Sequence, residues 1–298
     1  MTAGKGDDMS NVTIALDTFM LRFLPLPEIA RIASEIGYPA VELSWREDFV
    51  PLLRRPRADA QRIAETRAAF KERNVEIATL VALFRWASPD ESERQAAIRY
   101  WKRAIEIAVE LGCSHMNSEF SGEFEDSVSL ASEGAFWKSI EEVLPLLERE
   151  GITLSLEPHP GDFVEDNNVA VDMIRSLNSD HVRYLYCAPH TFHLGENVAE
   201  MIRYAAPVLD HVHLADTFDH RMSSGLRYIV NPLGSTARVH QHLDIGEGEV
   251  DWDAVFGTLS DVGFKGILTS CVFAWEERAI ESARTMLDSI RTYHERYF

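Results

Sequence analysis

The sequence lacks any hydrophobic run that approaches the roughly 18 consecutive apolar residues of a transmembrane helix. It also lacks a secretion signal, because its N-terminus, MTAGKGDDMS, carries acids and glycines where a signal peptide has basic and then apolar residues. We therefore expect neither membrane insertion nor secretion, and predict a cytoplasmic protein.

Cysteine is scarce, with three in 298 residues: Cys113, Cys187 and Cys271. An odd number of widely spaced cysteines does not make a disulfide framework. Free thiols suit a reducing compartment, which agrees with the predicted location.

Basic residues are also in short supply, with 29 Lys and Arg against 48 Asp and Glu and a formal net charge of -19. Such a surface repels polyanions, so we expect no nucleic-acid partner. A small neutral substrate, or a divalent cation with its ligand, fits this charge better. With 46% hydrophobic residues the chain can bury a large core, and its length suits one domain.

No glycine-rich phosphate turn follows the first predicted strand, which argues against a doubly wound nucleotide-binding sheet. The chain instead alternates regularly between strand and helix patterns. Strands are predicted at residues 11–18, 40–43, 75–83, 114–117, 152–157, 182–186, 211–214 and 266–270. Strands that alternate with helices throughout predict an α/β fold, a closed (β/α)8 TIM barrel.

The barrel is expected to fill residues 11–298 as a single domain, after a disordered tail at 1–10. One helix has marked ends, with Ser88 as the predicted N-cap, Pro89 after it and Gly112 at the C-terminus. The segment 216–248 shows little periodicity. Because aperiodic loops of that length are usually functional or disordered, we predict a lid-like insertion there.

Polar residues gather where the predicted strands end. In LSLEPHPGDFVE a short apolar run stops at Glu157, and His159 follows between two prolines. The C-terminal strand ends of a barrel meet at one mouth, where such folds place their active sites. Alone, Glu157 could equally cap a helix or pair with an arginine.

Other strand ends add more residues of metal-binding type. These are Glu119, Cys187, His190, His213 and Asp216, joined by His240 and His242 from the long segment. Each histidine alone is more often a hydrogen-bonded core or loop residue, but several that converge on one mouth favour a shared site. Imidazole with carboxylate is typical of Mn, Fe, Co, Ni or Zn sites, so the sequence predicts a metal centre.

Four segments together resemble the sugar phosphate isomerase/epimerase group of xylose-isomerase-like barrels, whose relatives include endonuclease IV, inosose dehydratases and ketose 3-epimerases. The segments are LSLEPHPGDFVE, HTFHLG, DHVHLAD and RVHQHLDIGEGEVDW. The resemblance runs from about residue 11 to the C-terminus. It implies a metal held by Glu, Asp, His and Glu from strands five to eight, and Glu157 and His213 match the first and third of these. The acidic surface disfavours endonuclease activity.

The other two ligands depart from that pattern. At strand six, two registers fit: Cys187 with His190, or His190 with His193. We prefer the second, because the 33 residues from Glu157 to His190 suit one strand–helix unit.

At strand eight, Ser270 and Cys271 stand where the resemblance implies a glutamate. The nearest replacement ligand in the sequence is His242 or, less favourably, His240, although this pair could equally form a hydrogen-bonded hinge. The expected ligand set is then Glu157, His190, His213 and His242. Mn2+ is the first expectation for the metal, with Co2+, Zn2+ or Mg2+ as alternatives.

The resemblance also implies roles in catalysis. Glu157 would be metal ligand and base, His159 or His240 would move the proton, and Arg238 would orient hydroxyl groups. The candidate substrate-binding residues are Trp86, Glu119, Asp216 and Arg238. For Trp86 a flat apolar wall for a sugar ring competes with simple core packing.

Together these residues predict a metal-dependent isomerase or epimerase that abstracts a proton next to the carbonyl of a keto-sugar or related polyol. The missing strand-eight glutamate favours an alternative, a lyase or dehydratase of the inosose dehydratase type. A C-glycoside deglycosidase acting on 3-keto-glycosides with a small partner subunit belongs to the same alternative. The second alternative is a non-catalytic sugar-binding subunit. A small carbohydrate is the expected substrate, and a homo-oligomer or a complex with a small second subunit the expected assembly.

Overall fold

The computed structural model describes residues 12–43, 60–122, 129–192, 197–218 and 242–298. The predicted tail at 1–10 lies outside these ranges. So do residues 219–241, the greater part of the predicted lid-like insertion, which include Arg238 and His240. His193 also falls outside them.

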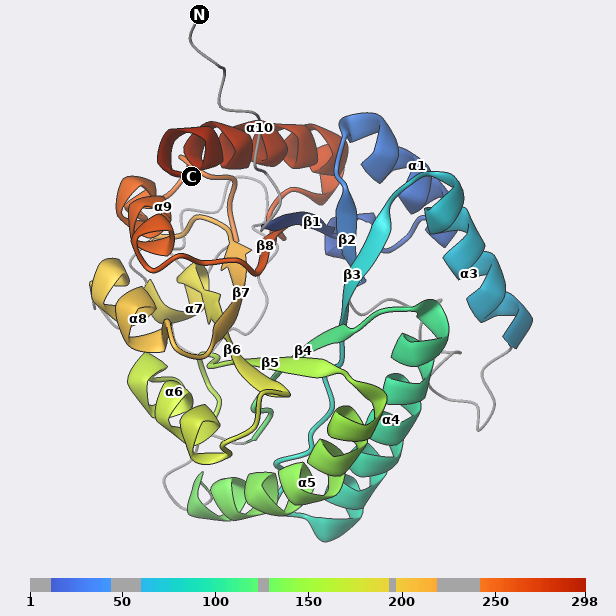
Figure 1. Cartoon of the computed structure of the whole chain (residues 1–298), viewed down its shortest axis with the longest axis vertical. Helices are drawn as coiled ribbons and strands as arrows, with labels where there is room; N and C mark the ends of the chain where they lie inside the picture. Colours follow the sequence, from blue (N-terminus) through green and yellow to red (C-terminus); the bar gives the residue numbers. More distant parts are fainter. Residues whose placement is uncertain (1–11, 44–59, 123–128, 193–196, 219–241) are drawn as a thin grey trace, which may run out of the picture.

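Eight parallel strands pair in chain order and close on themselves, so the predicted TIM barrel is confirmed. Figure 1 shows the strands at the centre of a ring of helices, with the colours running once around the ring from the N-terminus to the C-terminus. The strands are β1 (Thr13–Asp17), β2 (Ala40–Leu43), β3 (Glu76–Val81), β4 (His115–Glu119), β5 (Thr153–Glu157), β6 (Val182–Cys187), β7 (Leu209–Leu214) and β8 (Ile267–Ser270).

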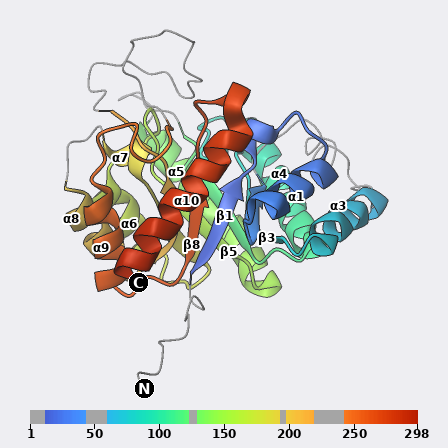
Figure 2. The same ribbon diagram turned by 90° about the horizontal axis from the view of Figure 1, so that it is seen from above.

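Helices follow the strands and, apart from the short α7 at the rim, cover the outside of the barrel. They are α1 (Leu26–Ile36), α3 (Ala60–Glu72), α4 (Glu91–Leu111), α5 (Ser129–Glu150), α6 (Asn167–Ser176), α7 (Ala188–Phe192), α8 (Val198–Ala205), α9 (Trp252–Asp261) and α10 (Ala279–Tyr297), with short 3-10 turns η1 (Phe19–Leu21) and η2 (Glu276–Arg278). Figure 2 shows α1, α3 and α4 on one side of the strands, α6, α8 and α9 on the other, and α10 lying across them. None of the described helices is long and apolar enough to cross a membrane.

The start of α4 differs from the prediction by two residues. Asp90, rather than Ser88, is the N-cap, and its carboxylate accepts hydrogen bonds from the backbone N–H groups of Ser92 and Glu93. Ser88 instead donates to the Glu93 side chain. The shift occurs because an ionised carboxylate is a stronger acceptor for the first N–H groups of a helix than a hydroxyl. Gly112 ends the helix in the left-handed region, as predicted.

The strand register brings the C-terminal strand ends to one rim. Glu119 at the end of β4 is level with Glu157 at the end of β5. Cys187 at the end of β6 is level with His213 on β7. Because all strands are parallel, the polar residues that end them meet above the packed barrel interior.

Candidate functional site

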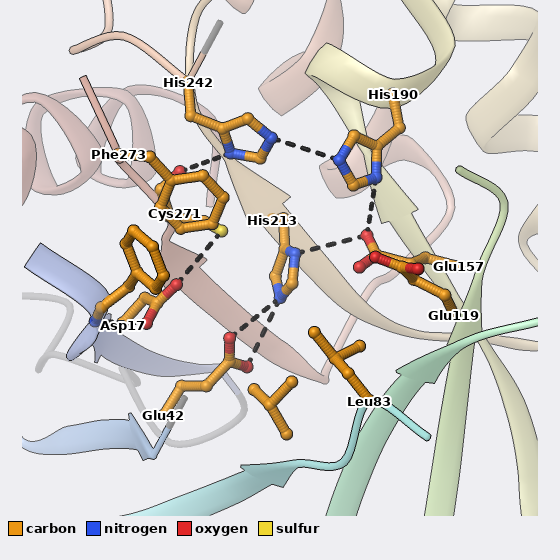
Figure 3. Close-up of a pocket in the computed structure, with 12 residues that line it drawn as sticks. Asp17, Glu42, Leu83, Glu119, Glu157, His190, His213, His242, Cys271 and Phe273 are labelled. Atoms are coloured by element: carbon orange, nitrogen blue, oxygen red, sulfur yellow. Dashed lines mark hydrogen bonds and ion pairs between the residues drawn. The ribbon is translucent and has the colours of Figure 1, made fainter. Parts of the chain in front are cut away.

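A cavity of about 390 Å³ opens at the C-terminal rim of the barrel. Its size falls within the usual range for small-molecule sites, roughly 300–1,000 Å³. Figure 3 shows its walls, with acids and imidazoles on several sides and apolar side chains between them. The lining residues are Asp17, Phe19, Glu42, Val81, Leu83, Glu119, Glu157, His190, His213, His242, Cys271 and Phe273.

Three of the predicted metal ligands meet at one carboxylate oxygen. Oε2 of Glu157 lies 3.1 Å from Nδ1 of His190 and 3.5 Å from Nδ1 of His213. All three residues are buried. They come from three successive units of the barrel: the end of β5, the short helix α7 after β6, and β7. The structure therefore brings together Glu157, His190 and His213, which lie far apart in the sequence.

The other ring nitrogen of His213 faces a second carboxylate. Nε2 of His213 lies 3.2 Å from Oε1 and 3.4 Å from Oε2 of Glu42, on β2. Nδ2 of Asn117 donates to Oε2 of Glu42 at 3.1 Å and lies 3.3 Å from Nε2 of His213. A carboxylate accepts hydrogen bonds, so Nε2 of His213 carries a proton and donates it to Glu42. Such a contact is typical of histidines that bind a metal through the other nitrogen, because it fixes the ring and its tautomer.

A hydrogen-bonded chain likewise fixes the orientation of His190. Nδ1 of His242 lies 2.7 Å from the carbonyl oxygen of Cys271, which only accepts, so that nitrogen carries the proton. In the neutral ring Nε2 of His242 is then an acceptor, and it lies 3.3 Å from Nε2 of His190. His190 therefore donates through Nε2, and its Nδ1 presents a lone pair toward Glu157.

Two imidazole nitrogens, Nδ1 of His190 and Nδ1 of His213, thus face one carboxylate oxygen of Glu157. Nδ1 of His190 faces an anionic oxygen, and in the described residues neither Oε2 of Glu157 nor Nδ1 of His213 makes a hydrogen bond of good geometry. A lone pair of neutral His190 that faces the buried carboxylate of Glu157 is repelled unless a cation lies between them. One carboxylate oxygen and two imidazole nitrogens form a donor set that fits a divalent transition metal.

Cys187 extends this cluster. The ligand atoms of Glu157, Cys187 and His213 lie within 4.8 Å of one another, and so do those of Cys187, His190 and His242. Burial raises the pKa of the Cys187 thiol to about 12. The side chain of His190 lines the cavity and that of Cys187 does not, which favours His190 over Cys187 at strand six.

Burial and charge set the protonation of the cluster. Burial lowers the pKa of His190 to about 4, and it holds the pKa of His242 well below its usual value. Burial also disfavours the charged form of Glu157, but His190 and His213 outweigh it and keep the pKa of Glu157 well below the usual range. For His213, the effect of burial is overcome by Cys271, Glu42 and Glu157, which raise its pKa well above the ordinary value. The rings of His190 and His242 are therefore neutral. The ring of His213 is protonated on both nitrogens, and a cation would displace its Nδ1 proton.

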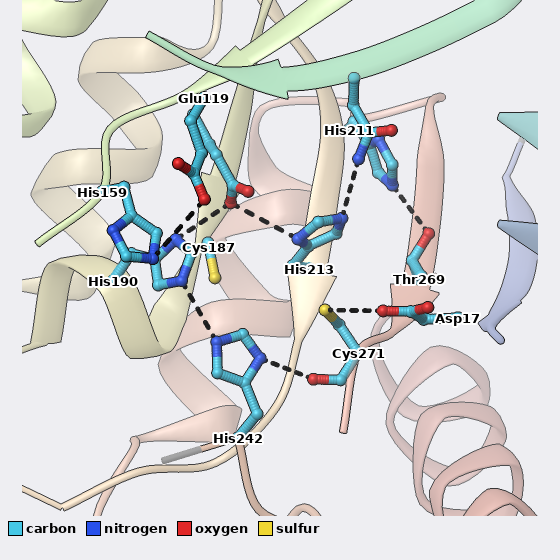
Figure 4. Close-up of polar contacts among 12 residues, drawn as sticks. Asp17, Glu119, His159, Cys187, His190, His211, His213, His242, Thr269 and Cys271 are labelled. Atoms are coloured by element: carbon cyan, nitrogen blue, oxygen red, sulfur yellow. Dashed lines mark hydrogen bonds and ion pairs between the residues drawn. The ribbon is translucent and has the colours of Figure 1, made fainter. Parts of the chain in front are cut away.

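The predicted residues Glu119 and His159 lie on the same side of the site. Glu119 lines the cavity beside Glu157, where it can reach a substrate. His159 is completely buried behind it: its Nδ1 lies 2.7 Å from the carbonyl oxygen of Pro160, and its Nε2 lies 3.7 Å from Oε1 of Glu119 (Figure 4). The His159 ring packs against the His190 ring at 4.2 Å between centroids. His159 is not among the residues that line the cavity, so the structure does not support the predicted role as a base that touches substrate.

Trp86 is not a wall of the cavity. Its side chain is fully buried and packs against Trp101 of α4 and Phe136 of α5. Its indole N–H donates to the backbone carbonyl of Glu119 at 3.2 Å. Two helices cover the ring, which favours core packing, the alternative considered for Trp86, over the predicted substrate-binding role.

Asp216 also differs from its predicted substrate-binding role. Its carboxylate accepts hydrogen bonds from the backbone N–H groups of Thr217, Gly246 and Val250 and from the indole of Trp252. A Cβ on Gly248 would lie 2.3 Å from Oδ1 of Asp216, so only glycine fits there. With its lone pairs engaged, Asp216 anchors the chain after the long segment instead of facing the cavity.

Two lining acids, Asp17 and Glu42, are missing from the sequence-based predictions. Asp17 ends β1, and Glu42 is the only acid in the short strand β2. The strand-end rule that identified Glu157 would have found both if applied to the first two strands. Deeper in the barrel, His211 contacts Thr269 at 2.7 Å and lies 3.6 Å from Glu42, so it belongs to the layer beneath the cavity (Figure 4).

Two curated proteins illustrate the sequence relatives. An inosose isomerase of Bacillus licheniformis is 24% identical over 162 residues, which are 53% of this chain and 54% of that protein. An inosose dehydratase of Clostridium perfringens is 25% identical over 137 residues, 44% of this chain and 46% of that protein. The aligned part thus spans about half the length of each of these relatives.

Solved structures resemble the whole chain. A structure of the IolI protein with a bound zinc atom has a TM-score of 0.77 at 19% identity, over 96% of this chain and 99% of that one. A D-psicose 3-epimerase in the presence of D-fructose has a TM-score of 0.75 at 13% identity, over 95% and 99%. The sequence model described as a xylose isomerase-like TIM barrel matches residues 30–290. The chain therefore belongs to the xylose isomerase-like TIM barrel family.

Proposed function

We propose that this protein is a metal-dependent isomerase or epimerase that removes the proton next to the carbonyl of a keto-sugar or related polyol. The observation that carries the proposal is the convergence of Oε2 of Glu157 with Nδ1 of His190 and Nδ1 of His213 in a cavity at the barrel mouth. The names of the relatives, an inosose isomerase and a D-psicose 3-epimerase, support the same substrate class.

Glu157, His190 and His213 would hold the metal, and His242 would either join them or orient His190. The imidazole content favours a transition ion over Mg2+, and it moves the expectation from Mn2+ toward Zn2+ or Co2+. A zinc atom bound to the structurally similar IolI protein is compatible with this choice.

Bound there, a divalent ion would polarise the substrate carbonyl and stabilise the enediolate formed on proton loss. Side chains of the protein would transfer the proton and bind the substrate. Oε2 of Glu157 faces the imidazoles, which leaves Oε1 to accept a proton from the substrate. Glu119, beside it, would bind a sugar hydroxyl. Val81 and Leu83 line the cavity as well, and apolar walls exclude water from the reacting carbon.

A lyase or dehydratase is the second candidate. The observation that favours it is at strand eight, where Cys271 lines the cavity in place of a second carboxylate. Elimination needs one strong base and an acid for the leaving group, and the inosose dehydratase among the relatives is of this type. Several expectations stay predictions. They are the roles of Arg238 and His240, the lid-like insertion, a small partner subunit or homo-oligomer, and the cytoplasmic location.

The metal content of the purified protein tests the proposed metal ligands. Protein purified without chelator should hold a transition metal in stoichiometric amount by atomic absorption. Glu157→Ala and His213→Ala should each lose it, because each removes a donor from the shared point. His115→Ala is the matched control, because His115 begins β4 at the opposite end of the barrel and should keep the metal. Unchanged metal in both site variants would refute the ligand assignment.

Deuterium exchange tests the reaction. The metal-loaded protein should catalyse exchange of the proton next to the carbonyl of at least one keto-sugar in D2O, detected by NMR. Exchange that requires Glu157 would support the proposed base. Stoichiometric metal and sugar binding without exchange across a screen of keto-sugars would instead favour the non-catalytic sugar-binding subunit.

A further inference from the structure

Asp17 places a carboxylate beside the end of strand eight. The register pairs Leu16 of β1 with Ser270 of β8, so the next residues, Asp17 and Cys271, are neighbours at the rim. The thiol of Cys271 donates to Oδ2 of Asp17 at 3.5 Å. Asp17 is buried and lines the cavity. Strand eight carries no acid at this level, and the adjacent strand supplies one.

The backbone holds this carboxylate in place. Oδ1 of Asp17 accepts a hydrogen bond from the backbone N–H of Phe19 at 2.8 Å. Phe19 also packs against Phe273, with 4.7 Å between ring centroids, and both rings line the cavity. A carboxylate fixed by its own turn and flanked by aromatic rings is oriented before a substrate arrives.

Asp17 and Glu157 lie on opposite sides of the cavity. Figure 3 shows Asp17 with Cys271 and Phe273 on one side, Glu157 with Glu119 on the other, and His213 between them. A substrate carbonyl held near His213 would therefore have a carboxylate on each side. Glu42 is a weaker candidate for the second group, since both its oxygens lie within 3.4 Å of Nε2 of His213 and Oε2 also accepts from Asn117.

We propose that Asp17 is a second catalytic acid/base, which faces the substrate from the side opposite Glu157 and makes the site competent for epimerisation. The proposal rests on the proposed function. Glu157 removes the proton from the carbon next to the carbonyl as the C–H electron pair moves into the enediolate. Protonated Asp17 then delivers its proton to the other face of the same carbon, and the opposite epimer reacts in the reverse order. Glu157 then loses its proton to solvent and Asp17 takes one up, which restores the starting state. No oxidant is needed, because one C–H bond breaks and one forms.

The test compares wild type with Asp17→Asn on a pair of keto-sugars that are epimers next to the carbonyl, with D-fructose and D-psicose as first probes. Asparagine keeps the acceptor for the Phe19 N–H but cannot accept or deliver a proton at working pH. We expect Asp17→Asn to keep its metal and its deuterium exchange into one epimer, while interconversion of the epimers falls by roughly 100-fold or more, a typical size for loss of an acid/base group. Asp17→Glu should recover part of the rate.

Asp180→Asn is the matched control, because the Asp180 side chain is fully exposed. It should behave as wild type. Interconversion by Asp17→Asn within about threefold of wild type, or equal loss of exchange from both epimers, would overturn the role of Asp17. Wild-type exchange without any interconversion would also overturn it, and would favour the lyase. A wild-type protein without metal or exchange would refute the proposed function itself, which is a separate result.

Discussion

Glu42 and His213 meet across the barrel interior, on β2 and β7, with Oε1 of Glu42 3.2 Å from Nε2 of His213. The two strands are not neighbours in the sheet, so the contact passes through the middle of the barrel. It leaves Nδ1 of His213 as the nitrogen that faces Glu157. Glu42 would thus be a positioning residue for the proposed metal centre.

Replacement of Glu42 should therefore weaken metal binding without removing a ligand. We expect Glu42→Gln to lower metal affinity by roughly 10–100-fold, the usual cost of losing a carboxylate partner of a ligating histidine. Competition with a chromophoric chelator measures this. Glu200→Gln, at an exposed position on α8, is the control. Equal affinity in the two variants would mean that Glu42 does not position His213.

The buried neutral state of His190 predicts a pH dependence of the metal-free protein. Burial lowers its pKa to about 4, from 6.5 in the unfolded chain, so between these values the unfolded state binds more protons. The contribution of His190 to the free energy of unfolding is present above pH 6.5 and falls as the pH drops toward 4, by on the order of 3 kcal/mol. The pKa of His213 is raised, so its contribution to the free energy of unfolding is present below pH 6.5 and is lost as the pH rises.

Urea unfolding of chelator-treated protein between pH 7.5 and 5 would measure this effect. We expect His190→Asn to lose less stability than wild type over that range, because the substituted side chain does not titrate. The same pH slope in both proteins would show that His190 is not held neutral by its surroundings.

His159 should act through its neighbours. Because it is buried behind Glu119 and packs against His190, His159→Asn should keep the metal and slow turnover by less than about tenfold. The sequence alone predicts a general base, whose loss typically costs roughly 100-fold or more. Solvent deuterium exchange into a bound keto-sugar distinguishes the two roles, and loss of exchange in His159→Asn would restore His159 to the mechanism.

Asp216 should matter for stability and not for substrate affinity. Asp216→Ala would leave three backbone N–H groups and the Trp252 indole without their acceptor, which should lower the free energy of unfolding by roughly 3 kcal/mol or more. Urea unfolding measures the loss, with Asp180→Ala as an exposed control. A raised KM with unchanged stability would contradict this anchoring role.

Alternating strand and helix patterns are local, so the sequence is enough to predict the barrel. The ends of parallel strands must share one rim, so the sequence also places Glu157 and His213 there, and the family resemblance marks them as candidate ligands. Which side chains face one another depends on the packing of elements that are distant in the sequence. Glu42 meets His213 over 171 residues of chain, and Asp17 meets Cys271 over 254.

The differences between the predicted and observed surroundings of Trp86 and Asp216 share one cause. The sequence predicts Trp86 at the rim, but Trp101 and Phe136 from two separate helices enclose it. Asp216 ends its strand as predicted, yet donors from residues 246–252 fold back onto its carboxylate. A strand end fixes where a residue lies. The direction and partners of its side chain depend on packing by elements distant in sequence, which periodicity does not encode.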